Sequence, residues 1–407
     1  MRSEIKKPNI VIIMLLVSYC AVAATLISPS LPDITISFHL DSFLIQLIII
    51  LFAFGYGFGQ LLFGPLANLY GRKPALYIGM AFAFIASVLS GVAGPVDSYG
   101  LLLFSRILTA FAGAVGLVIS FAMVGDVYNP SETRKMTGWI ILAFVFVPAF
   151  MAAIGGFLVE HISWESCFYF QAIYSAILVF LIYLLPETFT KRKKIHLKQM
   201  LIGLKEHFLQ PKLILYAWIL SCGTTYFFLY AAKGPFIGID EIGLSPSYYG
   251  LLTLLMPAGL FIGVLLTRYC ARFCSAHNSI WIGCGIIGVS AMAMFWLFYF
   301  DIINPWTLVI PNACIWTGLA FTYTNSSAIA ISVAEDKAYG SSVINFVNIC
   351  SGAVGTLIYS SIFSHWNLML PISFLIIGLF MTGCLVALQI IFHYQTRSVA
   401  HKKRVKR

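Results

Sequence analysis

Twelve stretches of about 20 apolar residues follow one another along this chain, and they leave it few ways to fold. Over the whole chain, 60% of the 407 residues are hydrophobic and only 10% are charged, whereas soluble domains carry about 25% charged residues. A helix of about 20 residues spans the hydrocarbon core of a bilayer. We therefore predict an all-α membrane protein with twelve transmembrane helices, at residues 10–31, 43–67, 74–94, 100–125, 137–160, 166–185, 213–236, 247–270, 279–300, 306–332, 340–363 and 368–394.

The charged residues predict how the helices are oriented. Of the 25 Lys and Arg residues, only Arg106 and Lys233 lie outside alternate gaps between the apolar stretches, and the other gaps carry acidic residues instead. Cations mark the cytoplasmic side of a membrane protein. This pattern predicts that both termini are cytoplasmic, and it explains the net charge of +10 without a nucleic-acid partner.

One long hydrophilic segment divides the chain. We expect a six-span bundle at 1–186, a cytoplasmic linker at 187–212, a second six-span bundle at 213–394 and a basic cytoplasmic tail at 395–407. In the linker, the cations 191–194 precede Leu197, Leu201, Leu204 and Phe208, which share one helical face. This spacing fits a basic amphipathic helix on anionic lipid of the inner membrane surface, and it fits a solvated linker helix equally well.

The sequence from Gly59 to Pro74, GQLLFGPLANLYGRKP, carries the clearest motif. We predict that the second helix ends at Gly64-Pro65, and that a short cytoplasmic link delivers Arg72 and Lys73 just before the third helix. Pro74 suits the first turn of that helix.

This motif resembles the loop between spans 2 and 3 of the major facilitator superfamily, G-x-L-x-D-x-x-G-R-R/K. The fuller form GPLxDxxGRRP is similar to the twelve-span drug:proton antiporter branch that includes the bicyclomycin-resistance transporters. The residues that fit are Gly64, Pro65, Leu66, Gly71, Arg72, Lys73 and Pro74, and Asn68 replaces the family's Asp. The resemblance implies the major facilitator fold, in which two six-helix bundles alternate access to a midplane site.

Further matches to this family point to conformational and coupling residues. Asp126 matches the Asp of R-D-x-Y at the inner end of span 4, which implies a pair with Arg72 or Arg134 that closes an inner gate between the halves; an ordinary helix-end charge is the alternative. Pro186-Glu187-Thr188 closes the sixth stretch and resembles the family's PET sequence.

Span 5 resembles the antiporter motif ending P-x-x-G-G. Pro148, Gly155 and Gly156 carry this match, and Ala152 replaces the second proline usual in the branch. The family links the motif to antiport rather than symport. Glycine pairs also serve tight helix packing, which is the alternative reading.

Ionisable residues at membrane depth are functional candidates by default. Arg106 resembles the Arg of the span-4 motif L-x-x-R-x-x-Q-G, which the family links to proton coupling, although Thr109 replaces the Gln. It could instead be a structural Arg that pairs with Asp33 or a carbonyl. Lys233 could extend outward to the membrane surface, or face the cavity and bind an anionic substrate group.

The main departure from the branch is in span 1. Pro29-Ser-Leu-Pro32 matches its P-x-L-P sequence, but Thr25 occupies the position where the branch carries an Asp. Without that acid, proton coupling must use Asp33, Asp126 or a less usual group.

Polar and aromatic residues that interrupt the apolar stretches predict an uncharged cavity. Intramembrane amides are costly unless they bridge helices or line water, so some of these residues could bridge helices instead. The candidates are Tyr19, Thr25, Tyr56, Thr224, Tyr226, Tyr230, Lys233, Asn312, Trp316, Tyr323, Asn345 and Asn348.

The sequence contains no HExxH, GxSxG or GxxxxGK[ST] motif, and none of its nine cysteines forms a C-x-x-C pair. It thus predicts no enzyme, cofactor, metal site or disulfide framework. We expect a monomeric transporter of a bacterial-type inner membrane that exports drugs or similar amphipathic molecules, with protons as the coupled ion. The alternative is a transporter of one endogenous compound, such as a siderophore or metabolite, without proton coupling.

Overall fold

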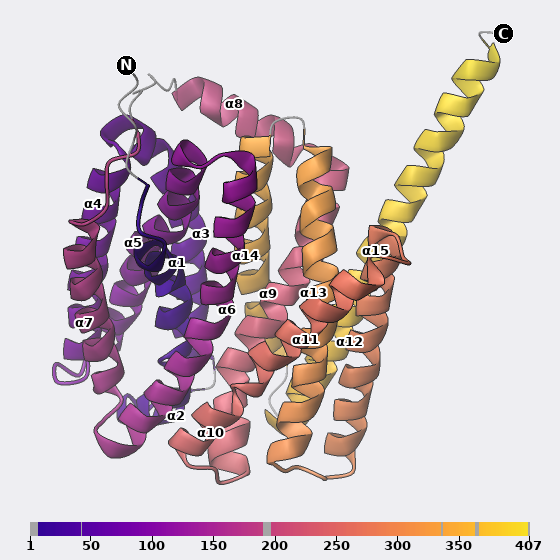
Figure 1. Ribbon diagram of the computed structural model, residues 1–407. Coiled ribbons are helices and arrows are strands. Elements are labelled where there is room, and N and C mark those ends of the chain that lie inside the picture. The colour runs from indigo at the N-terminus through magenta and orange to yellow at the C-terminus, as the bar shows by residue number, and fades with distance from the viewer. Residues whose placement is uncertain (1–6, 42, 190–196, 335–336, 363–365, 406–407) are drawn as a thin grey trace.

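The computed structural model describes residues 7–41, 43–189, 197–334, 337–362 and 366–405 (Figure 1). Every regular element among these residues is a helix, as the apolar stretches predict. The first part of the chain forms α1 (Ile10–Thr25), η1 (Ser28–Ser30), α2 (Leu31–Ser37), α3 (Leu44–Tyr70), α4 (Arg72–Val92), α5 (Tyr99–Val127), α6 (Pro130–His161) and α7 (Glu165–Ile182).

The second part begins with the linker helix α8 (Leu197–Phe208), whose range agrees with the predicted amphipathic helix. It continues with α9 (Pro211–Pro235), η2 (Phe236–Glu241), α10 (Pro246–Leu252), α11 (Leu255–Cys270), α12 (Ala276–Tyr299), α13 (Pro305–Val333), α14 (Lys337–Ile362) and α15 (Trp366–Val405). The basic cluster at 191–194 lies outside the described residues.

Among the described residues, ten helical segments are long and apolar enough to cross a membrane. They include three composite segments, namely α1 to α2, α9 with η2, and α10 with α11. Two further long helices, α6 and α13, correspond to the predicted fifth and tenth spans. The predicted class, an all-α protein whose helices are long and apolar enough to cross a membrane, is therefore confirmed for the described residues.

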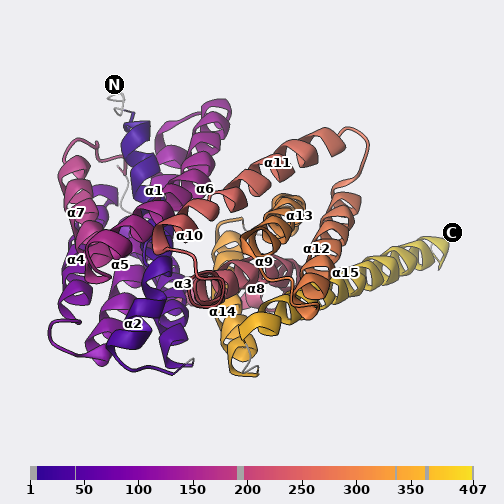
Figure 2. The same ribbon diagram turned by 90° about the horizontal axis from the view of Figure 1, so that it is seen from below.

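The two sets of helices lie side by side (Figures 1 and 2). Across the boundary α3 packs against α14, and α6 packs against α10. One buried core is shared at this boundary: Leu26 and Ile45 of the first set lie in the same cluster as Phe228 and Ala353 of the second. The beginning of α1, the end of α15 and α8 all lie at one end of the molecule (Figure 1).

The structure corrects the prediction that the second helix ends at Gly64-Pro65. Helix α3 continues through Pro65 to Tyr70, and α4 begins at Arg72, so Gly71 alone separates the two helices. Proline is tolerated inside membrane helices because neighbouring groups can satisfy the backbone carbonyl that it leaves free. Gly71 makes the turn with φ +107°, a conformation that other residues rarely adopt.

Two other boundaries differ from the prediction. The first span extends to Ser37, because the chain forms the short helices η1 and α2 around Pro29 and Pro32. The tail predicted at 395–407 is helical up to Val405, since α15 continues without a break.

Candidate functional site

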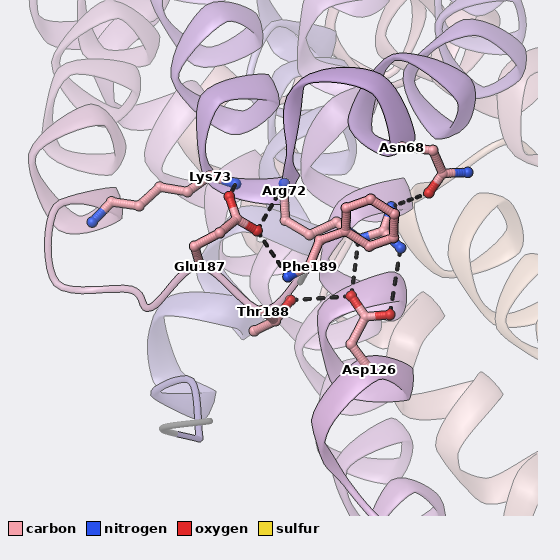
Figure 3. Close-up of polar contacts among 7 residues, drawn as sticks. All are labelled: Asn68, Arg72, Lys73, Asp126, Glu187, Thr188 and Phe189. Carbon is pink, nitrogen blue, oxygen red and sulfur yellow. Dashed lines mark hydrogen bonds and ion pairs between the residues drawn. The ribbon is translucent and has the colours of Figure 1, made fainter. Parts of the chain in front are cut away.

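Arg72 is the centre of a polar cluster at the end of the molecule where α3 meets α4 (Figure 3). Only 7% of this residue is exposed. Its Nε donates to Asp126 Oδ2 at 2.9 Å, and its Nη2 donates to Asp126 Oδ1 at 3.4 Å. The third nitrogen, Nη1, donates to Asn68 Oδ1 at 2.8 Å. The guanidinium therefore binds the carboxylate with two nitrogens and the amide with the third, which fixes its orientation.

The three residues that follow Pro186 complete this cluster. Glu187 accepts the backbone N–H of Arg72 through Oε1 and that of Lys73 through Oε2, each at 3.0 Å. Thr188 Oγ1 donates to Asp126 Oδ2 at 3.1 Å. The ring of Phe189 lies 4.6 Å from the Arg72 guanidinium carbon, within the range of a cation–π contact.

Glu187 thus caps helix α4. The first N–H groups of a helix lack intrahelical partners, and Gly71, at the N-cap position, has no side chain to bind them. A Cβ at Gly71 would lie 2.8 Å from Glu187 Oε2. Glycine therefore both permits the turn and leaves room for the carboxylate that replaces the missing cap.

The predicted pair of Asp126 with Arg72 is present, but its place differs from the expectation. The described contacts of this cluster join α3, α4, α5 and the segment after α7, all from the first set of helices. They fix one end of the first set of helices and do not bridge the two sets. The side chain of Arg134 lies outside the described residues.

Arg106 on α5 is buried, with 1% of its surface exposed. Its Nη2 donates to the carbonyl of Ala23 at 3.1 Å, and its guanidinium carbon lies 4.2 Å from the centroid of the Phe52 ring. Its Nε and Nη1 have no hydrogen-bond partner among the described residues. Of the two structural partners considered from sequence, the structure shows the carbonyl and not Asp33, which is half-buried on α2.

Tyr19 lies inside the first bundle rather than between the bundles. Its hydroxyl accepts hydrogen bonds from Ser175 at 3.0 Å and from Gln171 Nε2 at 3.2 Å, and it lies 3.3 Å from the Ser87 hydroxyl. These partners belong to α4 and α7. Tyr19 therefore links helices of one half.

Thr25 and the predicted antiporter motif contact each other. The Thr25 hydroxyl donates to the carbonyl of Pro148 at 2.8 Å and joins α1 to α6. Both glycines of the motif, Gly155 and Gly156, stand about two turns further along α6. A Cβ on Gly155 would overlap the carbonyl of Leu26, and a Cβ on Gly156 would overlap the carbonyl of Pro246 on α10. The glycine pair allows α6 to pack closely between the two halves.

Several predicted cavity residues meet where α3, α9, α13 and α14 approach one another. Thr224 Oγ1 donates to Asn348 Oδ1 at 2.7 Å, and Asn348 Nδ2 donates to the Tyr323 hydroxyl at 3.4 Å. Tyr56, on α3, lies near Tyr323. Tyr323 remains 43% exposed although it lies next to these interior residues. These residues both bridge helices and present an aromatic surface; Asn345 is half-buried nearby on α14.

The remaining predicted residues lie deeper in the second set of helices. The Tyr226 hydroxyl donates to the carbonyl of Phe374 at 2.6 Å, which fixes it in the bundle core. Lys233 is 1% exposed, so the reading that its ammonium extends outward to the surface is wrong. Trp316 is half-buried, and its indole N–H has no hydrogen-bond partner among the described residues.

Asn312 and Tyr230 lie together with Tyr249, a residue that sequence reasoning missed. Asn312 is fully buried, and within the part of the chain that the structure describes neither its amide atoms nor the two tyrosine hydroxyls make a hydrogen bond of normal geometry. Tyr249 stands in an ordinary helix start, SPSYYG, and no local pattern marks it.

Sequence reasoning also missed that Glu187 caps α4 in the Arg72 cluster. The signal that could have found it was an acidic residue directly after the sixth span.

Comparison with known proteins agrees with this architecture. The family model for the Major Facilitator Superfamily matches residues 12–357. The chain is 25% identical over 354 residues to a bicyclomycin resistance protein homolog of Haemophilus influenzae, covering 81% of this chain and 86% of that one. It is 24% identical over 352 residues to multidrug resistance protein D of Escherichia coli, covering 86% of this chain and 87% of that one.

Two further relatives are uncharacterized transporters of Rickettsia. The Rickettsia felis protein is 30% identical over 269 residues (65% of this chain), and the Rickettsia bellii protein is 31% identical over 246 residues (60% of this chain). The matches span 64% and 60% of those relatives' own lengths.

Among solved structures, a crystal structure of a D-xylose-proton symporter superposes with a TM-score of 0.75 at 14% identity, covering 91% of this chain and 96% of that one. A partially occluded inward-open structure of the xylose transporter XylE from E. coli gives a TM-score of 0.72 at 14% identity, covering 93% and 95%. At these identities the likeness shows the fold alone. The fold, the motifs and the family match together place this multi-pass membrane transporter in the Major Facilitator Superfamily.

Proposed function

We propose that this chain exports drugs or similar amphipathic molecules across a bacterial-type inner membrane, in exchange for protons. The observation that carries the proposal is the aromatic, uncharged surface between the halves. Tyr323 is 43% exposed there, next to Tyr56 and Asn348. Aromatic rings bind apolar and cationic organic groups with little geometric demand. Such a surface favours amphipathic substrates over inorganic ions.

More aromatic side chains continue this surface. The ring of Phe58 on α3 lies 5.5 Å from that of Phe346 on α14, and Phe346 lies 6.0 Å from Phe208 of the linker helix. Phe58 is half exposed. The row connects the first half, the second half and α8, so a bound aromatic compound can contact all three.

The relatives support the choice of substrate class. A bicyclomycin resistance protein homolog and a multidrug resistance protein each match more than four fifths of this chain. Their names describe those proteins, and we extend them to this one because the motif at Arg72 resembles the same branch.

For coupling we propose the predicted candidates Arg106, Asp33 and Asp126. Thr25 replaces the branch's acid and bonds to a backbone carbonyl, so no carboxylate is available at that position. Asp33 is half-buried in the first span, where it can exchange protons as the helices move.

The remaining features of the proposal concern movement and placement. The two halves, 1–186 and 213–394, rock about the shared surface as rigid bodies, and the Arg72 cluster keeps the inner end of the first one rigid. Both termini are cytoplasmic, as the cations indicate. The linker at 187–212 lies on anionic lipid, and the protein works as a monomer.

The test of export by antiport is proton release from inside-out vesicles. Vesicles that contain the protein are acidified inside, and a panel of amphipathic compounds is added. We expect compound-dependent proton release that is absent from vesicles without the protein. If no compound of a broad panel releases protons, the antiport proposal is wrong.

A second candidate function is transport of one endogenous compound without protons. Two observations favour it: Thr25 in place of the branch's acid, and Asn68 in place of the motif's Asp. Comparing the drug tolerance of cells with and without the gene discriminates the two. Unchanged tolerance together with an altered content of one metabolite would select this second function.

A further inference from the structure

Three buried polar side chains of the second half lie together without satisfying one another. Tyr230 of α9, Tyr249 of α10 and Asn312 of α13 form this group, and their exposed fractions are 6%, 1% and 0%. Across the described ranges of the chain, neither hydroxyl and neither polar atom of the amide has a hydrogen-bond partner of normal geometry. We call these three residues the polar cluster. Buried polar groups in native proteins are nearly always paired, so the cluster requires an explanation.

The packing around the polar cluster holds its phenols in place. A Cβ on Gly234 would lie 2.7 Å from the Tyr249 hydroxyl oxygen and 3.2 Å from two ring atoms of Tyr230. Glycine at this position therefore leaves room for both phenols against α9. Their hydroxyls are held beside Asn312 by the fold, although they gain no hydrogen bond of normal geometry there.

The first half covers the polar cluster. Ser28 of η1 lies near the Tyr249 hydroxyl, and its own hydroxyl donates to the carbonyl of Ala231 on α9 at 3.1 Å. Two residues before Tyr249, the backbone N–H of Ser247 donates to Oε2 of Glu160 on α6 at 2.9 Å. Both contacts cross between the halves. Separation of the halves during transport would therefore expose the cluster to the space between them.

Trp316 connects the polar cluster to the middle of the membrane. It follows Asn312 by four residues on α13, so the two side chains share one face of that helix. Trp316 lies about 16 Å from the start of α13 by helical rise, roughly half of the hydrocarbon thickness of a bilayer. It is half-buried, its indole N–H is unpaired among the described residues, and its ring lies 6.0 Å from that of Phe227. A molecule bound beside Trp316 can therefore extend a polar group to Asn312.

The groups of the polar cluster specify what can bind to them. The Asn312 amide offers an acceptor and a donor side by side, and each phenol can both donate and accept. A carboxamide or a lactam presents the complementary donor and acceptor on adjacent atoms and carries no charge. Lys233 stands one turn from Tyr230 on α9, but it makes an interaction of its own. The unpaired groups of the cluster are therefore neutral, and they suit a neutral ligand group.

We propose that the polar cluster is a binding subsite for an uncharged amide group of the transported molecule, and that Asn312 recognises this group. The substrate amide pairs with the Asn312 amide through two hydrogen bonds, while the apolar body of the substrate lies against Trp316. The unpaired groups cost free energy in the substrate-free protein, and pairing with the substrate recovers it. The inference rests on the proposed function and names a chemical group that its substrates share.

A stability comparison tests whether the polar cluster serves binding or the fold. The Tm of the purified full chain is measured in detergent without ligand. Asn312→Leu and Tyr249→Phe remove unpaired polar atoms at nearly constant volume, so neither should lower the Tm. Tyr226→Phe is the matched control, because its hydroxyl donates to the carbonyl of Phe374 at 2.6 Å. Loss of that bond should lower the Tm by roughly 2–4 °C.

Three matched compounds test the subsite itself, namely 2-naphthamide, methyl 2-naphthoate and 2-naphthoate. Their dissociation constants are measured by titration calorimetry on the same preparations. The ester keeps an acceptor but has no donor, so the wild-type protein should bind the amide roughly tenfold more tightly than the ester. Asn312→Leu should bind the amide and the ester equally. Tyr249→Phe, which removes a second group of the cluster, should also lower the ratio.

Several results would overturn the inference. These are equal binding of amide and ester by the wild-type protein, a ratio that Asn312→Leu leaves unchanged, and no binding of either compound. A fall in the Tm of Asn312→Leu as large as that of Tyr226→Phe, or loss of its fold, would assign the cluster to the fold instead. Tighter binding of 2-naphthoate than of the amide would assign the site to a cation such as Lys233.

These outcomes are separate from those for export. Selective binding of the amide, together with vesicles that release no protons, would end the antiport proposal and leave the subsite established. Compound-dependent proton release, together with equal binding of amide and ester, would support export and end the subsite.

Discussion

The Oε1 atom of Glu187 accepts the backbone N–H of Arg72 at 3.0 Å, although the two residues are 115 positions apart in the chain. This hydrogen bond brings the end of the sixth span to the beginning of the third. In the same place, Arg72 binds Asp126 of α5 and Asn68 of α3. Four segments of the first set of helices therefore meet around one guanidinium.

Removing the cap should destabilise the first bundle. Glu187→Ala leaves the N–H groups of Arg72 and Lys73 without their acceptor, and loss of a helix cap costs about 1 kcal/mol. We expect the free energy of unfolding, measured by denaturant titration in detergent, to fall by about that amount. Glu206→Gln on the exposed side of α8 is the control and should leave it unchanged. Equal stability of Glu187→Ala and the wild-type protein would show that water replaces the cap without cost.

Arg72→Lys tests whether the cluster needs a guanidinium rather than a positive charge. Lysine keeps the charge but cannot bind Asp126 with two nitrogens and Asn68 with a third, nor stack on Phe189 in the same way. We expect export in vesicles to fall roughly tenfold, since each lost charge-assisted bond is worth about 1.5–3 kcal/mol. The conservative replacement Lys73→Arg should keep most of the activity, because among the described residues the Lys73 side chain donates to the carbonyl of Tyr183 and not to Asp126. Full activity of Arg72→Lys would contradict the proposed role.

A single methyl group on Gly156 should block the approach of the halves. A Cβ there would overlap the carbonyl of Pro246, and backbone atoms cannot move aside as a flexible side chain can. We expect Gly156→Ala to lower the transport rate at least tenfold and to increase the solvent accessibility of the contact between α6 and α10. Gly288→Ala on α12, where a Cβ would meet nothing within 4 Å, should transport normally. Wild-type transport by Gly156→Ala would rule out close packing of α6 and α10 during the cycle.

Tyr323 should contribute its ring, rather than its hydroxyl, to substrate binding. Its hydroxyl accepts from Asn348 Nδ2 at the long distance of 3.4 Å, and the residue is 43% exposed. Tyr323→Ala should therefore raise KM for an aromatic substrate roughly tenfold, because a lost aromatic contact is worth about 0.5–1.5 kcal/mol beyond its area. Tyr323→Phe should change KM less than threefold. A larger effect of Tyr323→Phe than of Tyr323→Ala would assign the binding to the hydroxyl. Tyr269 is exposed at the end of α11, and Tyr269→Ala serves as the control variant.

Much of this molecule follows from local sequence. Apolar stretches of membrane length determine the helices, since the bilayer requires every backbone N–H and C=O to bond within its own helix. The motif from Gly64 to Pro74 indicated the family, and the match at Asp126 gave Arg72 and Arg134 as its two candidate partners, of which the structure shows Arg72. The predicted end at Gly64-Pro65 was wrong because a proline rule derived from water-soluble helices does not hold where neighbouring helices surround the backbone.

Which side chains meet was decided only by tertiary structure. Tyr19 and Tyr56 both looked like cavity residues, yet Tyr19 bonds inside the first bundle while Tyr56 faces Tyr323 across the boundary. Glu160 and Ser247 carry no shared motif, and their bond exists only because two glycine-lined helices pack together. Hydropathy acts residue by residue along the chain, whereas these contacts depend on the rotation and spacing of helices that are distant in sequence.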